Sequence, residues 1–286
     1  MRLFYILLFF IFVSNCSFDN KSGIWNNENI KVEKKENDIF KDFKKTSVSF
    51  KTFDKVIPIK KNYKFYLNEV YSNDSWEDGF YKDNNNTRNF KLNEFNNIFK
   101  TKKISKFQAN ERILFSKNNL ILSDNKGNLI IFSLDNNSII SSFNFYKKKF
   151  KKIEKKLNLL LDKEIIYVSD NLGYLYAYNF LSQKILWAKS YKVPFRSNMK
   201  IFSNNIVISN QNNDLLIIDK RAGDLIKLIP TEETLINNSF ENNITLGKKE
   251  IFFINTYGSL YSVNKSNLNL NWFINLNKTL ELNLSN

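Results

Sequence analysis

Residues 165–187 read IIYVSDNLGYLYAYNFLSQKILW, and this stretch decides the fold. Two short apolar segments flank Gly173, and a third begins after the polar turn residues at 181–184. Glycine accepts the positive φ of a tight hairpin turn because it has no Cβ to clash with the backbone. Short segments rich in Ile, Val and Tyr that alternate with turn residues are typical of strands. The stretch therefore predicts three antiparallel strands joined by two turns.

Three further stretches repeat this pattern along the chain. The residues at the first turn are Gly127, Gly173, Asn213 and Gly258, which lie 46, 40 and 45 residues apart. A period of about 40–45 residues built from short antiparallel strands is typical of a β-propeller blade. The competing fold, a β-sandwich, has no need for strands that repeat in sequence. Leucine stands two positions after the turn in every copy, at Leu129, Leu175, Leu215 and Leu260, and an apolar residue stands five positions after it, at Phe132, Tyr178, Ile218 and Val263.

The beginning of the chain has the features of a lipoprotein signal peptide. Residues 3–13 form an unbroken run of eleven apolar residues after the positive charge of Arg2. This run fits the core of a signal peptide and is too short to span a bilayer as a helix. Cys16 is the only cysteine and stands where such a signal ends, so we expect a lipid on its sulfur. The alternative is an ordinary secretory signal followed by a chance cysteine. The predicted organisation is a signal peptide at 1–15, a lipid-anchored polar tether at 16–70 and a partial propeller at 71–286.

Composition argues against most kinds of catalytic site. The chain has one cysteine and no histidine. An intramolecular disulfide is therefore impossible, and the commonest general base and transition-metal ligand is missing. We expect no enzyme activity, no cofactor and no metal. The net charge of +15 comes from lysines spread through the chain, and we interpret the densest run, Lys147 to Lys156, as a solvated loop or short helix without a nucleic-acid partner.

Two of the copies resemble the quinoprotein-type (PQQ-like) propeller repeat. In that repeat a Leu-Tyr pair follows the turn glycine, and a later tryptophan docks one blade on the next. Here the pairs follow Gly173 and Gly258, and the docking tryptophans are Trp187 and Trp272. The other two copies have Ser141 and Lys227 at the tryptophan position. Joined to a lipoprotein signal, this repeat resembles the BamB family of outer-membrane β-barrel assembly lipoproteins. The segment Ser75-Trp76-Glu77-Asp78-Gly79 also resembles the lead-in to that family's first blade.

The resemblance implies an all-β propeller of four-stranded blades in a ring of eight. The four recognisable copies would supply about half of that ring, as in a truncated or partial copy. It also implies a non-catalytic scaffold that is anchored by lipid to the periplasmic side of the outer membrane. Such a scaffold binds BamA and other barrel-assembly subunits and helps to deliver unfolded outer-membrane proteins. The loop at 192–197 loosely matches the family's BamA-contacting loop, so we expect Pro194, Phe195 and Arg196 to contact the partner.

Two other functions remain open from the sequence. The repeat is shared with PQQ-dependent dehydrogenases, which enclose their cofactor in a full ring and hold calcium with carboxylates. Asp124, Asp170 and Asp219 recur near strand ends, although an aspartate at a turn normally serves the turn itself. The other alternative is a lipoprotein that acts as a surface adhesin or binds a solute.

The lipid anchor leads to a first prediction. Replacing Cys16 with alanine removes the sulfur that would carry the lipid, so the Cys16→Ala chain should be released from membranes. Partitioning into detergent, compared between the wild type and the variant, measures this release. Equal retention of both proteins in the membrane fraction would show that Cys16 is not the anchor.

Overall fold

The computed structural model describes most of the chain from Ser75 onward. The described residues are 75–86, 89–90, 100–146, 150–232 and 241–276, with Lys64, Val70 and two short strands near the N-terminus. These two strands, β1 (Ser17–Phe18) and β2 (Trp25–Asn26), pair antiparallel. The chain divides into two compact units, Met1–Lys44 and Lys45–Asn286, and all the larger sheets belong to the second unit.

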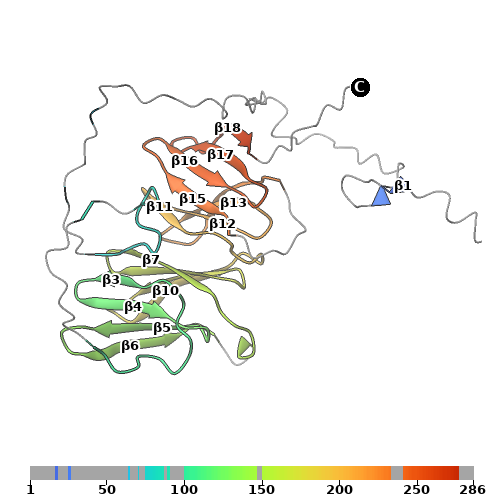
Figure 1. Ribbon diagram of the computed structural model, residues 1–286. Coiled ribbons are helices and arrows are strands. Elements are labelled where there is room, and N and C mark those ends of the chain that lie inside the picture. The colour runs from blue at the N-terminus through green and yellow to red at the C-terminus, as the bar shows by residue number, and fades with distance from the viewer. Residues whose placement is uncertain are drawn as a thin grey trace, which may run out of the picture. The chain divides into compact units, whose positions relative to one another are not determined.

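Four antiparallel sheets of four strands each make up the described part of the second unit. Within each sheet every strand pairs with its neighbours in sequence, and the sheets follow one another in chain order, from green to red in Figure 1. We number the sheets as blades 1 to 4. Their strands are β3 (Leu114–Ser116), β4 (Asn119–Ser123), β5 (Asn128–Ser133) and β6 (Ser138–Asn144) in blade 1; β7 (Leu157–Asp162), β8 (Ile165–Asp170), β9 (Tyr174–Asn179) and β10 (Lys184–Ser190) in blade 2; β11 (Lys200–Phe202), β12 (Asn205–Ser209), β13 (Leu215–Asp219) and β14 (Leu225–Ile229) in blade 3; and β15 (Asn243–Leu246), β16 (Glu250–Ile254), β17 (Ser259–Asn264) and β18 (Leu270–Asn275) in blade 4.

The predicted turns have the expected backbone geometry. The four turn residues all have positive φ, at 82° for Gly127, 85° for Gly173, 67° for Asn213 and 73° for Gly258. Three positions before each of them, an Asp or Asn side chain accepts hydrogen bonds of 2.7–3.1 Å from the backbone N–H groups two and four residues later. This Asx turn fixes the hairpin in every blade. The residues that accept these bonds are Asp124, Asp170, Asn210 and Asn255.

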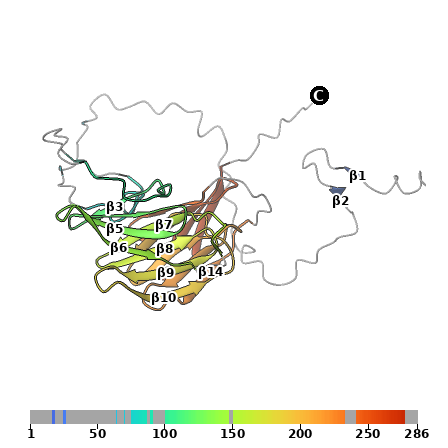
Figure 2. The ribbon, with the colours of Figure 1, turned by 90° about the horizontal axis from the view of Figure 1, so that it is seen from below.

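The last strand of each blade is its least buried strand. The first strands of neighbouring blades lie side by side, β3 with β7 and β11 with β15. The second and third strands are mostly buried, whereas the last strands, β6, β10, β14 and β18, are largely exposed or half-buried. In Figure 2 the last strand of blade 2, β10, lies at the margin of the stacked sheets. This order, with inner strands clustered and outer strands exposed, is that of propeller blades.

Neighbouring blades pack face to face through apolar side chains. We call the face that a blade turns toward the next blade its forward face, and the opposite face its backward face. The forward face holds the residues six positions before the turn residue and two, four and fourteen after it. Between blades 2 and 3 the contact is formed by Tyr167, Leu175 and Ala177 from blade 2 and by Ile206, Ile208, Leu216 and Ile218 from blade 3.

The repeat leucines follow this packing. Leu129, Leu175 and Leu215 are fully buried on the forward faces of blades 1 to 3. Leu260, at the same position of blade 4, is only half-buried. Blade 4 is the last of the four sheets in the chain, so no described blade follows it.

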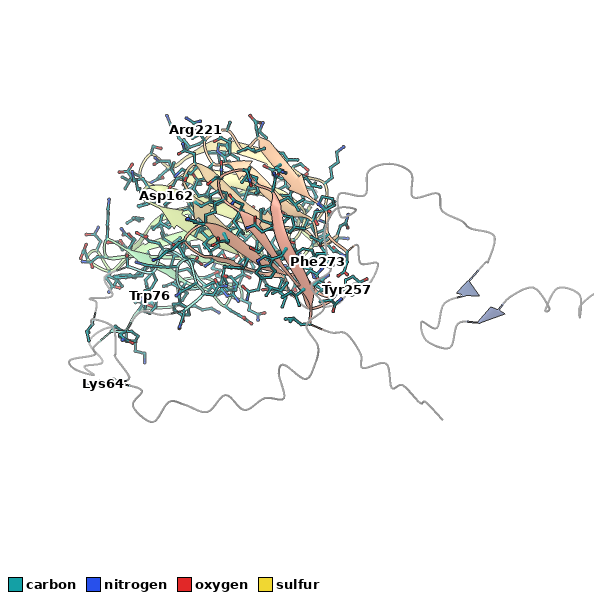
Figure 3. All side chains as sticks on the ribbon, turned by 90° about the horizontal axis from the view of Figure 1, so that it is seen from above. Lys64, Trp76, Asp162, Arg221, Tyr257 and Phe273 are labelled. Carbon is teal, nitrogen blue, oxygen red and sulfur yellow. The ribbon has the colours of Figure 1, made fainter. Side chains whose placement is uncertain are left out.

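A non-repeating segment crosses the inner strands of the blades. We call residues 75–86 the inner strap; it carries Trp76, which is labelled in Figure 3. Its backbone forms hydrogen bonds of 2.7–2.9 Å to strands of three blades. The bonded pairs are Trp76 with Phe115 in β3, Glu77 with Leu161 in β7, and Asp83 with Leu246 in β15.

The inner strap reaches the remaining blade through a buried ion pair. Asp78 Oδ2 lies 2.5 Å from the Nζ of Lys200, the first residue of β11, and the two side chains are 7% and 1% exposed. Lys200 also donates to the carbonyl of Lys82 in the strap. Burial raises the pKa of Asp78 and lowers that of Lys200, and their mutual attraction opposes both shifts. The pair therefore joins residues 122 positions apart in the sequence.

Breaking this pair should cost more than removing it completely. Asp78→Leu leaves the Lys200 ammonium buried without its counter-charge, which costs about 3–5 kcal/mol of unfolding free energy. The double variant Asp78→Leu/Lys200→Met buries neither charge, so its loss should be much smaller than the sum of the two single losses. Denaturant unfolding of the wild type and the three variants measures the coupling. Additive losses would mean that the two charges do not stabilise each other.

The repeat offers a matched comparison of leucine positions. Leu175→Ala and Leu215→Ala should each lower the unfolding free energy by about 2–5 kcal/mol, because both side chains are fully buried between blades. Leu260→Ala removes the same atoms from a half-buried site and should cost clearly less. Denaturant melts of the three variants test the comparison, and an equal loss at Leu260 would show that something covers the forward face of blade 4.

Candidate binding surface

The position fourteen residues after the turn contacts the next blade in blades 1 to 3. The side chain differs in each blade, but its polar atom reaches across the same interface each time. In every case the partner lies on the third strand of the next blade or in the turn that follows it. The contacts are Ser141 Oγ with Tyr178 OH at 3.2 Å, Trp187 Nε1 donating to the Lys220 carbonyl at 3.1 Å, and Lys227 Nζ donating to Asn269 Oδ1 at 2.8 Å.

Trp187 lies closely against the turn of blade 3 that receives it. A Cβ on Gly223 would lie 2.6 Å from Trp187 Cε3, so only glycine leaves room for the indole. The backbone of Gly223 also has a positive φ of 70°. Tyr191 donates from its hydroxyl to the Gly223 carbonyl at 2.7 Å. The indole of Trp187 thus packs against the turn at Gly223 and donates to the Lys220 carbonyl of the same turn.

The forward face of blade 4 has the same composition without the same cover. We call the position fourteen residues after the turn the docking position. In blade 4 it holds Trp272, which is 37% exposed and whose ring lies 6.1 Å from that of Phe252. Phe252 and Leu260 are half-buried, whereas the matching residues of blades 1 to 3 are all fully or almost fully buried. We call Phe252, Leu260 and Trp272 the open face. Within the part of the chain that the structure describes, it is the forward face that no following blade covers.

The expected partner loop at 192–197 is directed inward instead. Phe195 is 6% exposed and packs in the core between blades 2 and 3, with its ring 5.4 Å from that of Tyr191. Arg196 is 9% exposed, and its backbone N–H donates to the Ser209 carbonyl at 3.0 Å. Pro194 is half-buried. The side chains of Phe195 and Arg196 are therefore too buried to contact a partner at the surface. The reason is that the loop runs directly from one blade into the next, so a charge reversal at Arg196 would test folding rather than binding.

The remaining predicted sites divide into two groups. Cys16 lies outside the described residues. Asp124 and Asp170 accept backbone hydrogen bonds in their turns, and Asp219 accepts one from the N–H of Arg221, as expected of turn chemistry.

Among the described residues, no three acidic, histidine or cysteine side chains gather closely enough to hold a metal ion. The same residues include no helix long and apolar enough to cross a membrane.

The comparisons with known proteins concern the fold. No protein-family model matches the chain, and no curated protein matches it. Similar solved structures include BamB from Moraxella catarrhalis, at 11% identity and a TM-score of 0.45, where the match covers 54% of this chain and 49% of BamB. The designed protein Ika8 is 11% identical with a TM-score of 0.45, covering 55% and 46% of the two chains. The designed protein Ika4 is 10% identical with a TM-score of 0.44, covering 58% and 99%.

The chain thus spans about half the length of BamB and of Ika8. Its class follows from its own four-stranded antiparallel sheets, which are stacked in chain order with their inner strands adjacent. The chain is an all-β protein of the β-propeller type.

Proposed function

We propose that this protein is a non-catalytic propeller scaffold that binds other proteins through the open face of blade 4. The observation that carries the proposal is the repeated interface. Three forward faces built on one plan are each covered by a blade, and the fourth presents the same chemistry with Trp272 exposed. Large aromatic side chains with a polar atom are the usual anchors of protein interfaces.

The covered interfaces define the partner that the open face fits. The backward face that receives Trp187 is an apolar sheet with isoleucine at three of its contact positions, Ile206, Ile208 and Ile218. Beside it, a turn carbonyl accepts the indole N–H. The expected partner is therefore a β-sheet surface rich in β-branched side chains, with a backbone carbonyl within reach of the Trp272 indole.

The cellular setting of the proposal comes from the sequence. A lipid on Cys16 would hold the propeller at the periplasmic side of the outer membrane. The partners would be the periplasmic domains of BamA, other barrel-assembly subunits and unfolded outer-membrane proteins on their way to insertion. The BamB-like repeat and the lipoprotein signal support this assignment. The absence of histidine and the turn roles of Asp124 and Asp170 support a role without catalysis.

Binding to purified BamA periplasmic domains tests this proposal. The unlipidated Cys16→Ala chain is titrated with these domains, and binding is followed by calorimetry. Trp272→Asp places a charge on the open face, so it should weaken binding at least tenfold, or about 1.4 kcal/mol. Leu260→Asp should act in the same direction.

Leu225→Asp is the matched control. Leu225 is 47% exposed, comparable to Trp272, but lies on the outer strand of blade 3 and not on the open face. This variant should bind like the wild type, and circular dichroism should show an intact fold for all three. If the wild type does not bind, BamA is the wrong partner. If Trp272→Asp binds as well as Leu225→Asp, the open face is the wrong surface.

A further inference from the structure

A cavity of about 370 Å³ lies at the turn end of blade 1. This volume is within the range of small-molecule sites. The cavity combines positive charge with aromatic side chains, and none of the described residues that line it is acidic. We call it the lysine pocket, and it is lined by Phe107, Lys126, Asn128, Asn144, Tyr146, Lys151 and Lys155.

Lys155 is the unusual member of the lysine pocket. It is 1% exposed, although it belongs to the lysine-rich run that the sequence suggested was solvated. Among the described residues, the only other lysine that is buried as completely is Lys200, and the Asp78 carboxylate lies against that ammonium. Lys155 has no such carboxylate among the residues of the described ranges. Its ammonium donates to the Phe150 carbonyl and lies 5.1 Å from the centre of the Tyr146 ring.

A buried ammonium with only neutral partners is costly for the fold. Burial and the neighbouring charge of Lys126 both lower the pKa of Lys155. One of its three N–H donors is used by the Phe150 carbonyl, so two are left for another acceptor. An anion in the lysine pocket would accept these two bonds and supply the missing counter-charge.

The nearby carboxylates form no ion pair with a lysine of the pocket among the described residues. Asp124 accepts hydrogen bonds from the side chains of Ser105 and Asn128 and from two backbone N–H groups. Asp170 accepts one from the Tyr146 hydroxyl at 2.5 Å and two from its own turn. Both carboxylates therefore hold side chains of the pocket wall in place, Asn128 and Tyr146 respectively.

The wall of the lysine pocket is fixed before any ligand arrives. A Cβ on Gly127 would lie 2.3 Å from Tyr146 Cε2 and 3.3 Å from Lys155 Cγ, so the turn glycine gives both side chains their space. The Lys155 backbone N–H donates to the Asn125 carbonyl at 3.0 Å. A preformed site loses less entropy when it binds.

We propose that the lysine pocket binds a phosphate group whose organic part lies against Phe107 and Tyr146. Lys155 holds the phosphate at the inner end, and Lys126 and Lys151 hold it at the mouth. Lysine ammoniums are common phosphate ligands, and two or three of them match its charge. The phosphate could belong to a soluble phosphate ester or to a phospholipid headgroup, since both present the same oxyanion. This inference is independent of the proposed protein partner.

Binding of phenyl phosphate to the full chain tests the inference, with phenol as the uncharged comparison. Phenyl phosphate should bind at least tenfold more tightly than phenol, and high salt should weaken it. Lys155→Met keeps most of the apolar stem and removes the charge, so it should weaken phenyl phosphate binding at least tenfold. Lys152→Met is the matched control, because Lys152 is an exposed lysine of the same loop that does not line the pocket.

Short-chain phosphatidylglycerol, used below its micelle concentration, distinguishes the two sources. If it binds more tightly than phenyl phosphate, and loses that binding in Lys155→Met, the ligand is a phospholipid headgroup. If phenyl phosphate binds more tightly, the ligand is a soluble phosphate ester. Should Lys155→Met fail to fold, the double variant Lys126→Gln/Lys151→Gln at the mouth should weaken binding in its place. The inference is overturned if neither phosphate compound binds better than phenol, or if binding is unchanged in the lysine variants that fold.

Discussion

A four-stranded sheet with apolar side chains on both faces has to be covered on both sides, and in this chain the cover is the neighbouring blade. That requirement explains why the repeat keeps the residue class at some positions and not at others. Leu175 and its equivalents are constrained because they lie between two sheets. The outer strands are the most exposed strands, although an aliphatic residue stands twelve positions after the turn in all four copies. The docking position tolerates serine, tryptophan and lysine because each has a polar atom that reaches the next blade.

The inner strap stabilises the arrangement of the blades in a different way from their stacking. Stacking joins each blade only to its neighbours, whereas the strap touches the inner strands of all four blades. Its contacts are mainly polar, and the Asp78–Lys200 pair is directional in a way that apolar packing is not. A buried pair of this kind adds little net stability, but it penalises any arrangement in which the two partners do not meet. The Asp78–Lys200 pair thus fixes which part of blade 3 lies against the strap.

The sequence predicted the repeating part of the fold well and the non-repeating part poorly. The turn residues, the core leucines and the four blades could all be found because each signal occurs four times. The inner strap occurs once, and nothing near Asp78 in the sequence indicates Lys200 as its partner. The loop at 192–197 misled the prediction because proline, an aromatic and arginine suggest a surface contact. Only nine residues connect β10 to β11, against twelve between β6 and β7, so this connection passes directly between the sheets and buries Phe195.

The span of the inner strap also sets an order of folding. Blades 1 and 2 are made of hairpins between sequence neighbours, and such local contacts form quickly once the residues are available. Asp78 lies 122 positions before Lys200 in the sequence, and the bond from Asp83 needs Leu246. The strap therefore has no complete binding site until blade 4 has formed. Although it precedes the blades in the sequence, the strap is the last segment to complete its contacts.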